Sequence, residues 1–291
     1  MPDITRRSLL ALSAVGVLAP ALLVRGDKTT NSELQALESQ HGARLGVWAT
    51  NTRTGATVAY RAGERFPMCS TFKTLAVTAI LRRDHDGEFL KRVITYTQKD
   101  VIDGSPITKD HVGTGMSVSD LCAAAIDYSD NTAANLLLRL IGGPSAVTQV
   151  ARSLGDPYTR LDRNEPTLNT SIPGDLRDTT TPAAFAGDYR RLVLGEGLCP
   201  EHRERLTGWL KANTTSANRF HAGLPSGWVI GDKTGSGDYG TANDVGVVWT
   251  THGTPIVIAV LTTKFTQDAG WDEPLVASAA AVVARTLAPG E

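Results

Sequence analysis

Strand-like segments occur near both ends of this 291-residue chain, whereas the long segment between them has a helical pattern. Apolar and β-branched residues at 45–50 and 57–60 flank a turn, and the same character returns at 228–233, 245–250 and 256–263. Because both ends contribute strands, they are expected to meet in one sheet. We therefore predict an α+β fold: an α/β/α sandwich whose antiparallel sheet is formed by both termini, with an all-α domain inserted between its strands.

Helical periodicity sets the expected domain boundaries. Terminal helices are predicted from Asn31 to about His41 and from Pro274 to Ala288. Central helices are predicted at 71–83, 118–127, 132–141, 144–154, 182–194 and 201–211. This pattern predicts an α/β domain from residues 27–61 and 213–291 and an all-helical domain from 62–212. A polar stretch with an Ω-type loop at 163–178 is long for a compact protein, which is typical of a functional loop.

The first residues have the features of an export signal. The motif TRRSLL at 5–10, which is similar to a twin-arginine signal, leads into an apolar run at 9–24 that is short for a membrane span of about 20 residues. Small residues predict cleavage after Ala21, and a Sec signal or a retained anchor is the alternative. We expect a mature chain without a membrane span, exported to the periplasm or cell envelope or secreted.

Composition excludes several classes of protein. Apolar residues make up 41% and charged residues 20%, which fits a globular protein, and 29 basic against 30 acidic residues provide no basic field for nucleic acid. The six histidines form no HExxH motif, and three cysteines are too few for a disulfide scaffold or a cysteine-rich zinc module. Cys69, Cys122 and Cys199 allow at most one disulfide, and three buried thiols are the favoured interpretation. We predict no metal, no cofactor and a monomer.

Three short motifs carry candidate chemistry. STFK at 70–73 places an amine one helical turn after a hydroxyl, where it can assist a serine nucleophile. SDN at 129–131 lies between two predicted helices, and KTG at 233–235 lies on a predicted strand. Taken singly, these motifs also fit an N-capping serine, an N-cap cluster and a strand that enters a turn. Their common order along the chain makes coincidence remote.

The three motifs together resemble the active-site serine enzymes that recognise penicillin. A further element, RNEPTLN at 163–169, resembles the ExxLN element of class A β-lactamases, and NRF at 218–220 resembles actinobacterial members. The resemblance covers nearly all of the mature chain, including GARLGV at 42–47 and DTTTP at 178–182. It implies hydrolysis of the β-lactam amide of penicillins and cephalosporins through an acyl-serine intermediate, which gives antibiotic resistance. The expected partners are β-lactams and mechanism-based inhibitors.

The resemblance also implies roles for individual residues. Ser70 would attack the lactam carbonyl, Lys73 and a water on Glu165 would share the proton transfer of acylation, and which of them is the base stays open. Glu165 would activate the water that hydrolyses the acyl-enzyme. Ser129 would pass a proton to the departing nitrogen, and the backbone N–H groups of Ser70 and Ser236 would form the oxyanion hole.

Substrate binding is implied for residues of all the motifs. The implied set is Asn131, Asn169, Arg219, Lys233, Thr234, Gly235 and Ser236. Asn131 would bind the acylamino side chain, whereas Arg219 would help the KTG strand to bind the carboxylate. Arg163 and Asp178 match the ion pair that closes the loop, so their role would be structural.

Departures from the family pattern affect the rim and the cysteines. The position of an aromatic gatekeeper is Gly104, which predicts a wider rim. The family's disulfide partner for Cys122 is replaced by Val77, and that for Cys69 by Gly237, which predicts a free Cys69 thiol.

Three other functions compete with this interpretation. A cell-wall transpeptidase or carboxypeptidase lacks the counterpart of Glu165 with Asn169, and a penicillin sensor needs a membrane signalling domain that is not visible in the sequence. GSGDYG at 235–240 satisfies GxGxxG, but a dinucleotide site needs a helix directly after the glycines, and a strand is predicted there.

Overall fold

The computed structural model describes residues 28–291, so the expected export signal at 1–21 lies outside the described residues. Over this range one sheet has five antiparallel strands in the order β2-β1-β9-β8-β7. Its strands are β1 (Arg44–Asn51), β2 (Thr57–Tyr60), β7 (Val229–Gly237), β8 (Thr241–Trp249) and β9 (Pro255–Thr263). The β1–β9 pair runs from Arg44 opposite Thr263 to Asn51 opposite Ile256, so the sheet joins segments from both ends of the sequence, as predicted.

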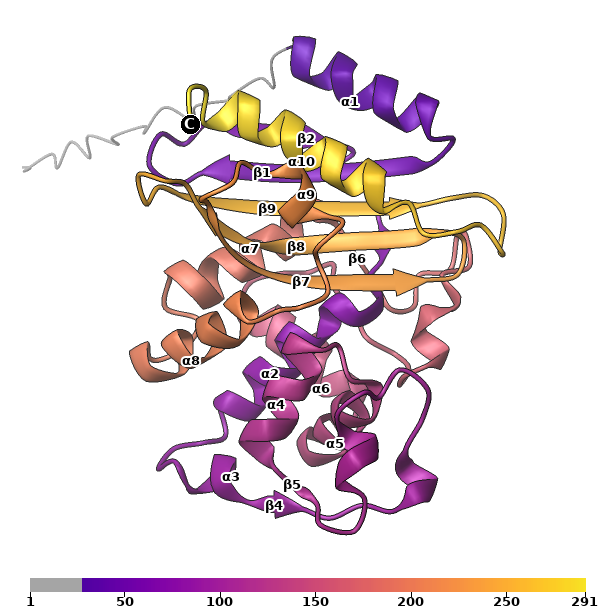
Figure 1. The fold of residues 1–291 in the computed structure, drawn as a ribbon, viewed down its shortest axis with the longest axis vertical. Coiled ribbons are helices and arrows are strands. Elements are labelled where there is room, and N and C mark those ends of the chain that lie inside the picture. The colour runs from indigo at the N-terminus through magenta and orange to yellow at the C-terminus, as the bar shows by residue number, and fades with distance from the viewer. Residues whose placement is uncertain (1–27) are drawn as a thin grey trace, which may run out of the picture.

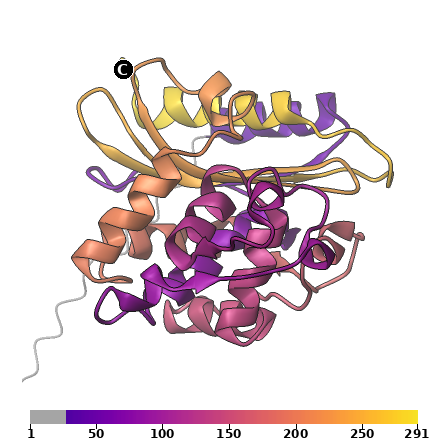
Figure 2. The ribbon, with the colours of Figure 1, turned by 60° about the horizontal axis from the view of Figure 1, so that its bottom comes forward.

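Helices cover both faces of this sheet. Figure 2 shows the sheet nearly edge-on, with α1 (Lys28–Gln40) and α10 (Glu273–Leu287) on one side and the helical region on the other. Alternate residues of β9 enter the two cores: Ile258 and Val260 face α10, whereas Val257 and Ala259 face the helical region. Because β9 is buried on both faces, its sequence is a continuous apolar run rather than an alternating one.

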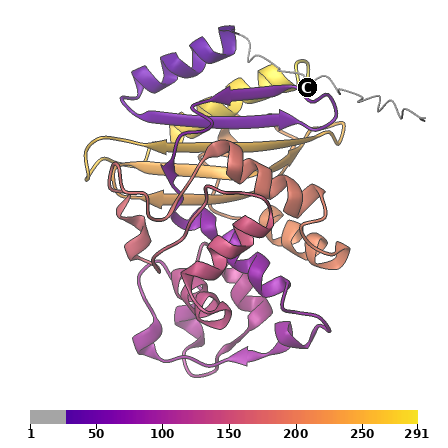
Figure 3. The same cartoon turned by 180° about the vertical axis from the view of Figure 1, so that it is seen from behind.

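The helical region is built around a helix without an exposed face. This helix is α2 (Lys73–Leu81), which Figure 1 shows among the other helices, and all nine of its residues are buried. Its neighbours are α4 (Val118–Asp127), α5 (Asn131–Ile141), α6 (Pro144–Ser153) and α8 (Pro200–Lys211). The view from behind in Figure 3 shows α7 (Pro182–Tyr189) lying along the sheet, and α7 contacts β1 and β9. α2 therefore holds its first residue, Lys73, in a fixed position.

Several short elements were not predicted. They are α3 (Glu88–Lys91), α9 (Phe220–Gly223), the strand pairs β3 (Phe66–Pro67) with β6 (Thr179–Thr180) and β4 (Val93–Ile94) with β5 (Met116–Ser117), and 3₁₀ turns at Cys69–Phe72, Gln98–Asp100, Thr108–His111 and Thr167–Thr170. Each is four residues or shorter, so periodicity in the sequence is too brief to indicate it. The predicted boundaries at 27–61, 62–212 and 213–291 stay predictions.

Three other expectations need correction or comment. The predicted helix 182–194 is α-helical to Tyr189 and continues as a π turn over Arg190–Leu194. Cys199 is exposed, so the expectation of three buried thiols is wrong: it directly precedes α8, which starts at Pro200 on the surface. The GSGDYG segment forms the end of β7 and the turn into β8, and no helix begins there. Within residues 28–291, none of the helices is long and apolar enough to span a membrane.

Candidate active site

Glycines bring the predicted nucleophile against the open edge of the sheet. The turn Cys69–Phe72 packs on the edge strand β7. A Cβ atom on Gly235 would lie 2.6 Å from the Met68 carbonyl oxygen and 3.1 Å from the Ser70 nitrogen, and one on Gly237 would lie 2.7 Å from Cys69 Sγ. These contacts exclude any side chain, so glycine is required for β7 to approach the backbone of Ser70.

Ser70, Lys73 and Glu165 meet at one carboxylate oxygen. Ser70 Oγ donates a hydrogen bond of 3.0 Å to Glu165 Oε1, and Lys73 Nζ lies 3.1 Å from the same oxygen. The side chains of Lys73 and Glu165 are fully buried. Burial lowers the pKa of Lys73, an effect that the Glu165 carboxylate opposes. The hydroxyl therefore has a carboxylate within direct reach, and an amine binds the same carboxylate oxygen, which leaves both candidate bases open.

Two asparagine side chains hold Glu165 through three hydrogen bonds. The Glu165 N–H donates to Asn135 Oδ1 at 3.0 Å, and Asn135 Nδ2 donates to the Glu165 carbonyl at 2.9 Å. Asn169 Nδ2 donates to Glu165 Oε2 at 2.6 Å. Sequence analysis missed Asn135, because an asparagine within a predicted helix has no local signal that marks it as a loop anchor.

The loop that carries Glu165 is tied at its ends. Arg163 Nε lies 2.5 Å from Asp178 Oδ2, and Asp178 Oδ1 accepts the backbone N–H groups of Asp162 and Arg163 at 2.7 and 3.0 Å. Arg163 also donates to Thr170 Oγ1 at 2.9 Å. The predicted pair is thus brought together and fixes where the loop starts and ends.

The SDN motif divides into one structural residue and two residues beside Lys73. Ser129 has a left-handed backbone with φ of 58°, which is uncommon outside glycine. Lys73 Nζ donates to the Ser129 carbonyl and to Asn131 Oδ1, both at 2.7 Å, and lies 3.3 Å from Ser129 Oγ. Asp130 is buried and caps α5 by accepting the Ala133 N–H at 2.8 Å, the ordinary role of an N-cap residue.

Two buried basic side chains lie at β7: Lys233 is on the strand itself, and Arg219 packs against it. Lys233 is fully buried and donates to the Thr234 carbonyl at 3.0 Å; burial, with Lys73 nearby, holds the pKa of Lys233 well below its usual range. Arg219 is also buried: it donates to Ser236 Oγ at 2.6 Å and to the Gly235 carbonyl at 3.0 Å, and its Nε lies 3.1 Å from Glu273 Oε1. Sequence analysis missed Glu273, since the two segments are 54 positions apart.

A cleft of about 660 Å³ joins these parts. Its walls include the predicted residues Ser70, Ser129, Asn131, Asn169, Arg219, Thr234, Gly235 and Ser236, together with the unpredicted Tyr128, Thr215, Trp271 and Glu273. Lys73, Glu165 and Lys233 lie beneath this surface and do not line it. Trp271 is 61% exposed and donates to the Gly237 carbonyl at 3.1 Å, and it comes from the segment between β9 and α10, which has no motif.

Two observations bear on the departures from the family pattern. Gly104 lines the cleft with φ of +76°, and a Cβ atom there would lie 2.6 Å from Asn131 Nδ2, so a side chain needs a different backbone. Cys69 is a free buried thiol, and burial raises its pKa to about 12. A thiol in this state is a poor nucleophile, which leaves Ser70 as the reactive group of this turn.

The fold and the cleft define the class as an active-site serine hydrolase with a buried Lys–Glu pair. The chain matches the family model described as "Beta-lactamase enzyme family" over residues 29–287, and it belongs to that family. It is 57% identical to a β-lactamase of Streptomyces lavendulae over 90% of this chain and 88% of that one, and 55% identical to β-lactamase AST-1 of Nocardia asteroides over 86% and 81%. The solved β-lactamase of Streptomyces albus G superposes with a TM-score of 0.88 at 56% identity, covering 89% of this chain and 99% of that one.

Proposed function

We propose that this class A β-lactamase opens the lactam ring of penicillins and cephalosporins with Ser70 as the nucleophile. The observation that carries the proposal is the meeting of Ser70 Oγ and Lys73 Nζ at one buried oxygen of Glu165. A serine hydroxyl needs a base within hydrogen-bond reach: Glu165 is at that distance, and Lys73 binds the same carboxylate oxygen. Opening the ring inactivates the antibiotic, which is the basis of resistance.

Acylation forms the Ser70 ester and breaks the lactam C–N bond. The proton of Ser70 Oγ passes to Glu165 or Lys73, and the leaving nitrogen takes a proton from Ser129 Oγ. Lys73 Nζ, 3.3 Å from that oxygen, can replace the proton on Ser129. The N–H groups of Ser70 and Ser236 stabilise the oxyanion, and the close packing of Gly235 on Ser70 supports this arrangement.

Deacylation needs a water between Glu165 and the ester. Glu165 accepts a proton from that water as it attacks the carbonyl carbon; when the ester C–O bond breaks, Glu165 returns the proton to Ser70 Oγ, 3.0 Å away, and Ser70 leaves as the alcohol. Asn169 Nδ2 is bonded to Glu165, whereas its Oδ1 is buried and has no hydrogen-bond partner among residues 28–291. An unpaired buried acceptor is costly unless it binds something, so Asn169 Oδ1 is suited to hold this water.

Substrate recognition is proposed to divide by chemistry. Asn131 binds the acylamino side chain, and the Thr234 and Ser236 hydroxyls bind the carboxylate at the edge of β7. Arg219 orients the Ser236 hydroxyl through its 2.6 Å hydrogen bond. Together with Lys233, which is buried beneath the cleft surface, it attracts the carboxylate. Gly235 leaves room for the ligand beside the strand, and Arg163 with Asp178 keeps the loop in place.

The export of the chain is a separate part of the proposal. We infer from the TRRSLL motif and the apolar run at 9–24 that residues 1–21 direct transport and are removed, so that a monomeric mature enzyme meets β-lactams and mechanism-based inhibitors in the cell envelope or outside the cell.

The test uses residues 22–291 and a chromogenic cephalosporin in large molar excess. A hydrolase turns over until the substrate is consumed, whereas a transpeptidase or a penicillin sensor is acylated once and stops. We expect sustained hydrolysis. A burst that equals the enzyme concentration, with no further turnover, would overturn the proposal.

A further inference from the structure

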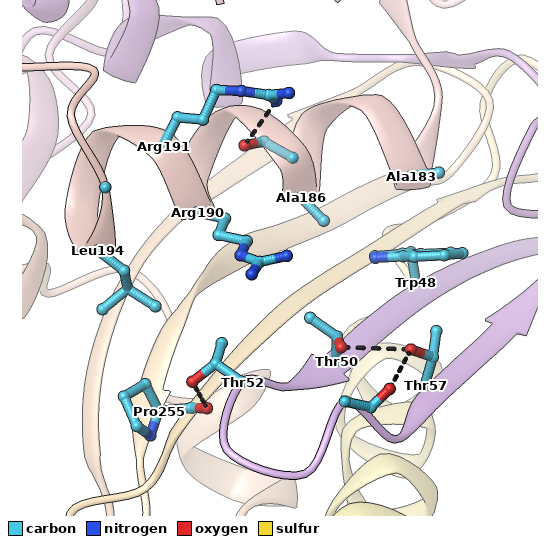
Figure 4. A pocket seen from close by; sticks show the side chains of 13 residues that line it. Trp48, Thr50, Thr52, Thr57, Ala183, Ala186, Arg190, Arg191, Leu194 and Pro255 are labelled. Carbon is cyan, nitrogen blue, oxygen red and sulfur yellow. Dashed lines mark hydrogen bonds between the residues drawn. The ribbon is translucent and has the colours of Figure 1, made fainter. Parts of the chain in front are cut away.

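A second hollow, the Trp48 pocket, lies away from the active site. It is bounded by the β1–β2 side of the sheet and by the segment that runs from α7 into the π turn Arg190–Leu194 (Figure 4). Its volume is about 860 Å³, larger than the catalytic cleft, and the two share no lining residue. Sites for small molecules have volumes of about 300–1,000 Å³, so this pocket can enclose one.

The charged residues that line the Trp48 pocket are all basic. Its described lining contains two arginines and neither aspartate nor glutamate. Arg190 is exposed; its backbone N–H is bonded within the helix, but its guanidinium has no hydrogen bond or ion pair to any residue in 28–291. In Figure 4 its guanidinium extends over the hollow toward Trp48. An unpaired guanidinium facing a space without acids is a site for an anion, above all for a carboxylate that accepts two parallel hydrogen bonds.

The neighbouring arginine does not share this position. Arg191 donates to the Gly187 carbonyl at 3.4 Å, and Figure 4 shows its side chain on the far side of the helical turn from Arg190. Two adjacent residues with the same charge thus differ in whether the guanidinium faces the pocket. This pair provides a matched control.

The rest of the pocket is suited to a flat apolar body. The half-buried Trp48 lies at one end, and Ala183, Ala186 and Leu194 form the helical wall. The hydroxyls on the strand side are already engaged: Thr50 Oγ1 lies 3.2 Å from Thr57 Oγ1, and Thr52 donates to the Pro255 carbonyl at 2.9 Å. Ring stacking and one cation therefore dominate what this surface offers a ligand.

We propose that the Trp48 pocket binds aromatic carboxylates, with the ring on Trp48 and the carboxylate on Arg190. The site is independent of β-lactam hydrolysis, and so is its test. The ligand class follows from an unpaired cation beside an aromatic face in a hollow without acidic residues.

The test is a titration of ¹⁵N-labelled residues 22–291 with 2-naphthoate, followed by NMR of the Trp48 indole N–H, which is assigned by its loss in Trp48→Phe. We expect a saturable shift. Arg190→Gln removes a charge-assisted contact and weakens binding by about tenfold or more, whereas Arg191→Gln stays within about twofold of the unchanged protein. The uncharged 2-naphthamide binds about tenfold more weakly than the acid.

Three results would overturn the proposal. One is no shift of the Trp48 resonance at millimolar 2-naphthoate. Another is equal weakening by Arg190→Gln and Arg191→Gln, which would indicate a general charge effect. The third is binding of 2-naphthoate that leaves the Trp48 resonance unchanged and competes with the cephalosporin, which would place the probe in the catalytic cleft.

Discussion

Two buried clusters of charge lie on either side of β7, and they are built in opposite ways. In the catalytic cluster a lysine faces a carboxylate, with Lys73 Nζ 3.1 Å from Glu165 Oε1. On the other face of the sheet two carboxylates, Asp232 of β7 and Asp244 of β8, share one buried region with Arg219 nearby. Opposite charges can both stay ionised when hydrogen bonds compensate for lost water, whereas like charges need a proton between them.

The proton of the second cluster can be assigned. Burial raises the pKa of Asp232 and holds that of Asp244 well above its usual range, and the charge of Asp232 adds to the effect on Asp244. Asp232 also accepts from Asn213 Nδ2 at 2.6 Å, so it is the better anion of the two. The higher pKa of Asp244 therefore assigns the shared proton to its carboxyl, beside Asp232. Burial of charge alone therefore does not mark a functional site. The catalytic cluster differs from the Asp232–Asp244 pair because it also has a nucleophile that lines a cleft.

The largest expected effect comes from removing that nucleophile. Ser70→Ala should reduce β-lactam hydrolysis on the order of 10⁶-fold, as the loss of a sole serine nucleophile does. The fold should persist, since among residues 28–291 Ser70 Oγ has one hydrogen bond, to Glu165. Hydrolysis rates and circular dichroism check this result, with Ser119→Ala on α4 as a control that keeps activity. More than trace turnover by folded Ser70→Ala protein would refute the assignment.

A smaller effect should separate the two half-reactions. Glu165→Ala removes the base for the deacylation water, so the variant should be acylated by a good substrate yet release product about 10²–10⁴-fold more slowly. Intact-mass spectrometry should show a persistent adduct on Ser70. Glu165→Gln, which keeps the size of the side chain and an acceptor for Asn169, should behave in the same way. Adduct decay at the unchanged protein's rate in either variant would contradict the role of Glu165.

The charge behind β7 should contribute less. Arg219→Ala removes one charge-assisted contact, about 1.5–3 kcal/mol, which corresponds to roughly a ten- to hundredfold fall in kcat/KM. We expect a fall near tenfold, because Thr234 and Ser236 line the same cleft and can still bind the carboxylate. The loss should shrink for a substrate whose carboxylate is esterified. Equal losses on free acid and ester would mean that Arg219 acts through structure, through its bonds to the Gly235 and Asn243 carbonyls.

These clusters also show how far sequence reasoning reaches. The strands and long helices are predictable because their periodicity is local, and the Ser70 and Lys233 motifs are recognisable because their residues are adjacent in the chain. The strand signal at 228–233 underestimates β7, which continues to Gly237: glycines weaken the pattern, yet the close packing on Ser70 requires them. Here the functional constraint overrides local propensity.

Contacts between segments that are far apart in the chain could not be predicted from the sequence. Asn135 meets Glu165 across 30 positions, and Asp244 lies beside Asp232 because β7 pairs with β8. Neither asparagine nor aspartate has a local signal for such a partner. The exposure of Cys199 was predicted wrongly for a similar reason, since composition says how often cysteine is buried but not where this helix begins.

The smallest effect concerns the proton between Asp232 and Asp244. The unfolded chain releases this proton near the ordinary pKa of 3.8, whereas the folded protein retains it to higher pH because burial raises the pKa of Asp244. The unfolded state then binds fewer protons, so the free energy of unfolding should fall as pH rises from 3.8 toward the folded pKa, by at most about 1.4 kcal/mol per pH unit for one proton.

Asp244→Asn should remove part of this slope. The amide can still accept from the Phe220 N–H, which lies 3.2 Å from Asp244 Oδ2, and its Nδ2 can donate to Asp232 in place of the proton. Urea unfolding of both proteins from about pH 5 to 8 should show a shallower decline for the variant. The exposed Asp268→Asn is the matched control and should keep the original slope. Parallel declines for Asp244→Asn and the unchanged protein would mean that this pair holds no proton, and the contrast between the two clusters would fail.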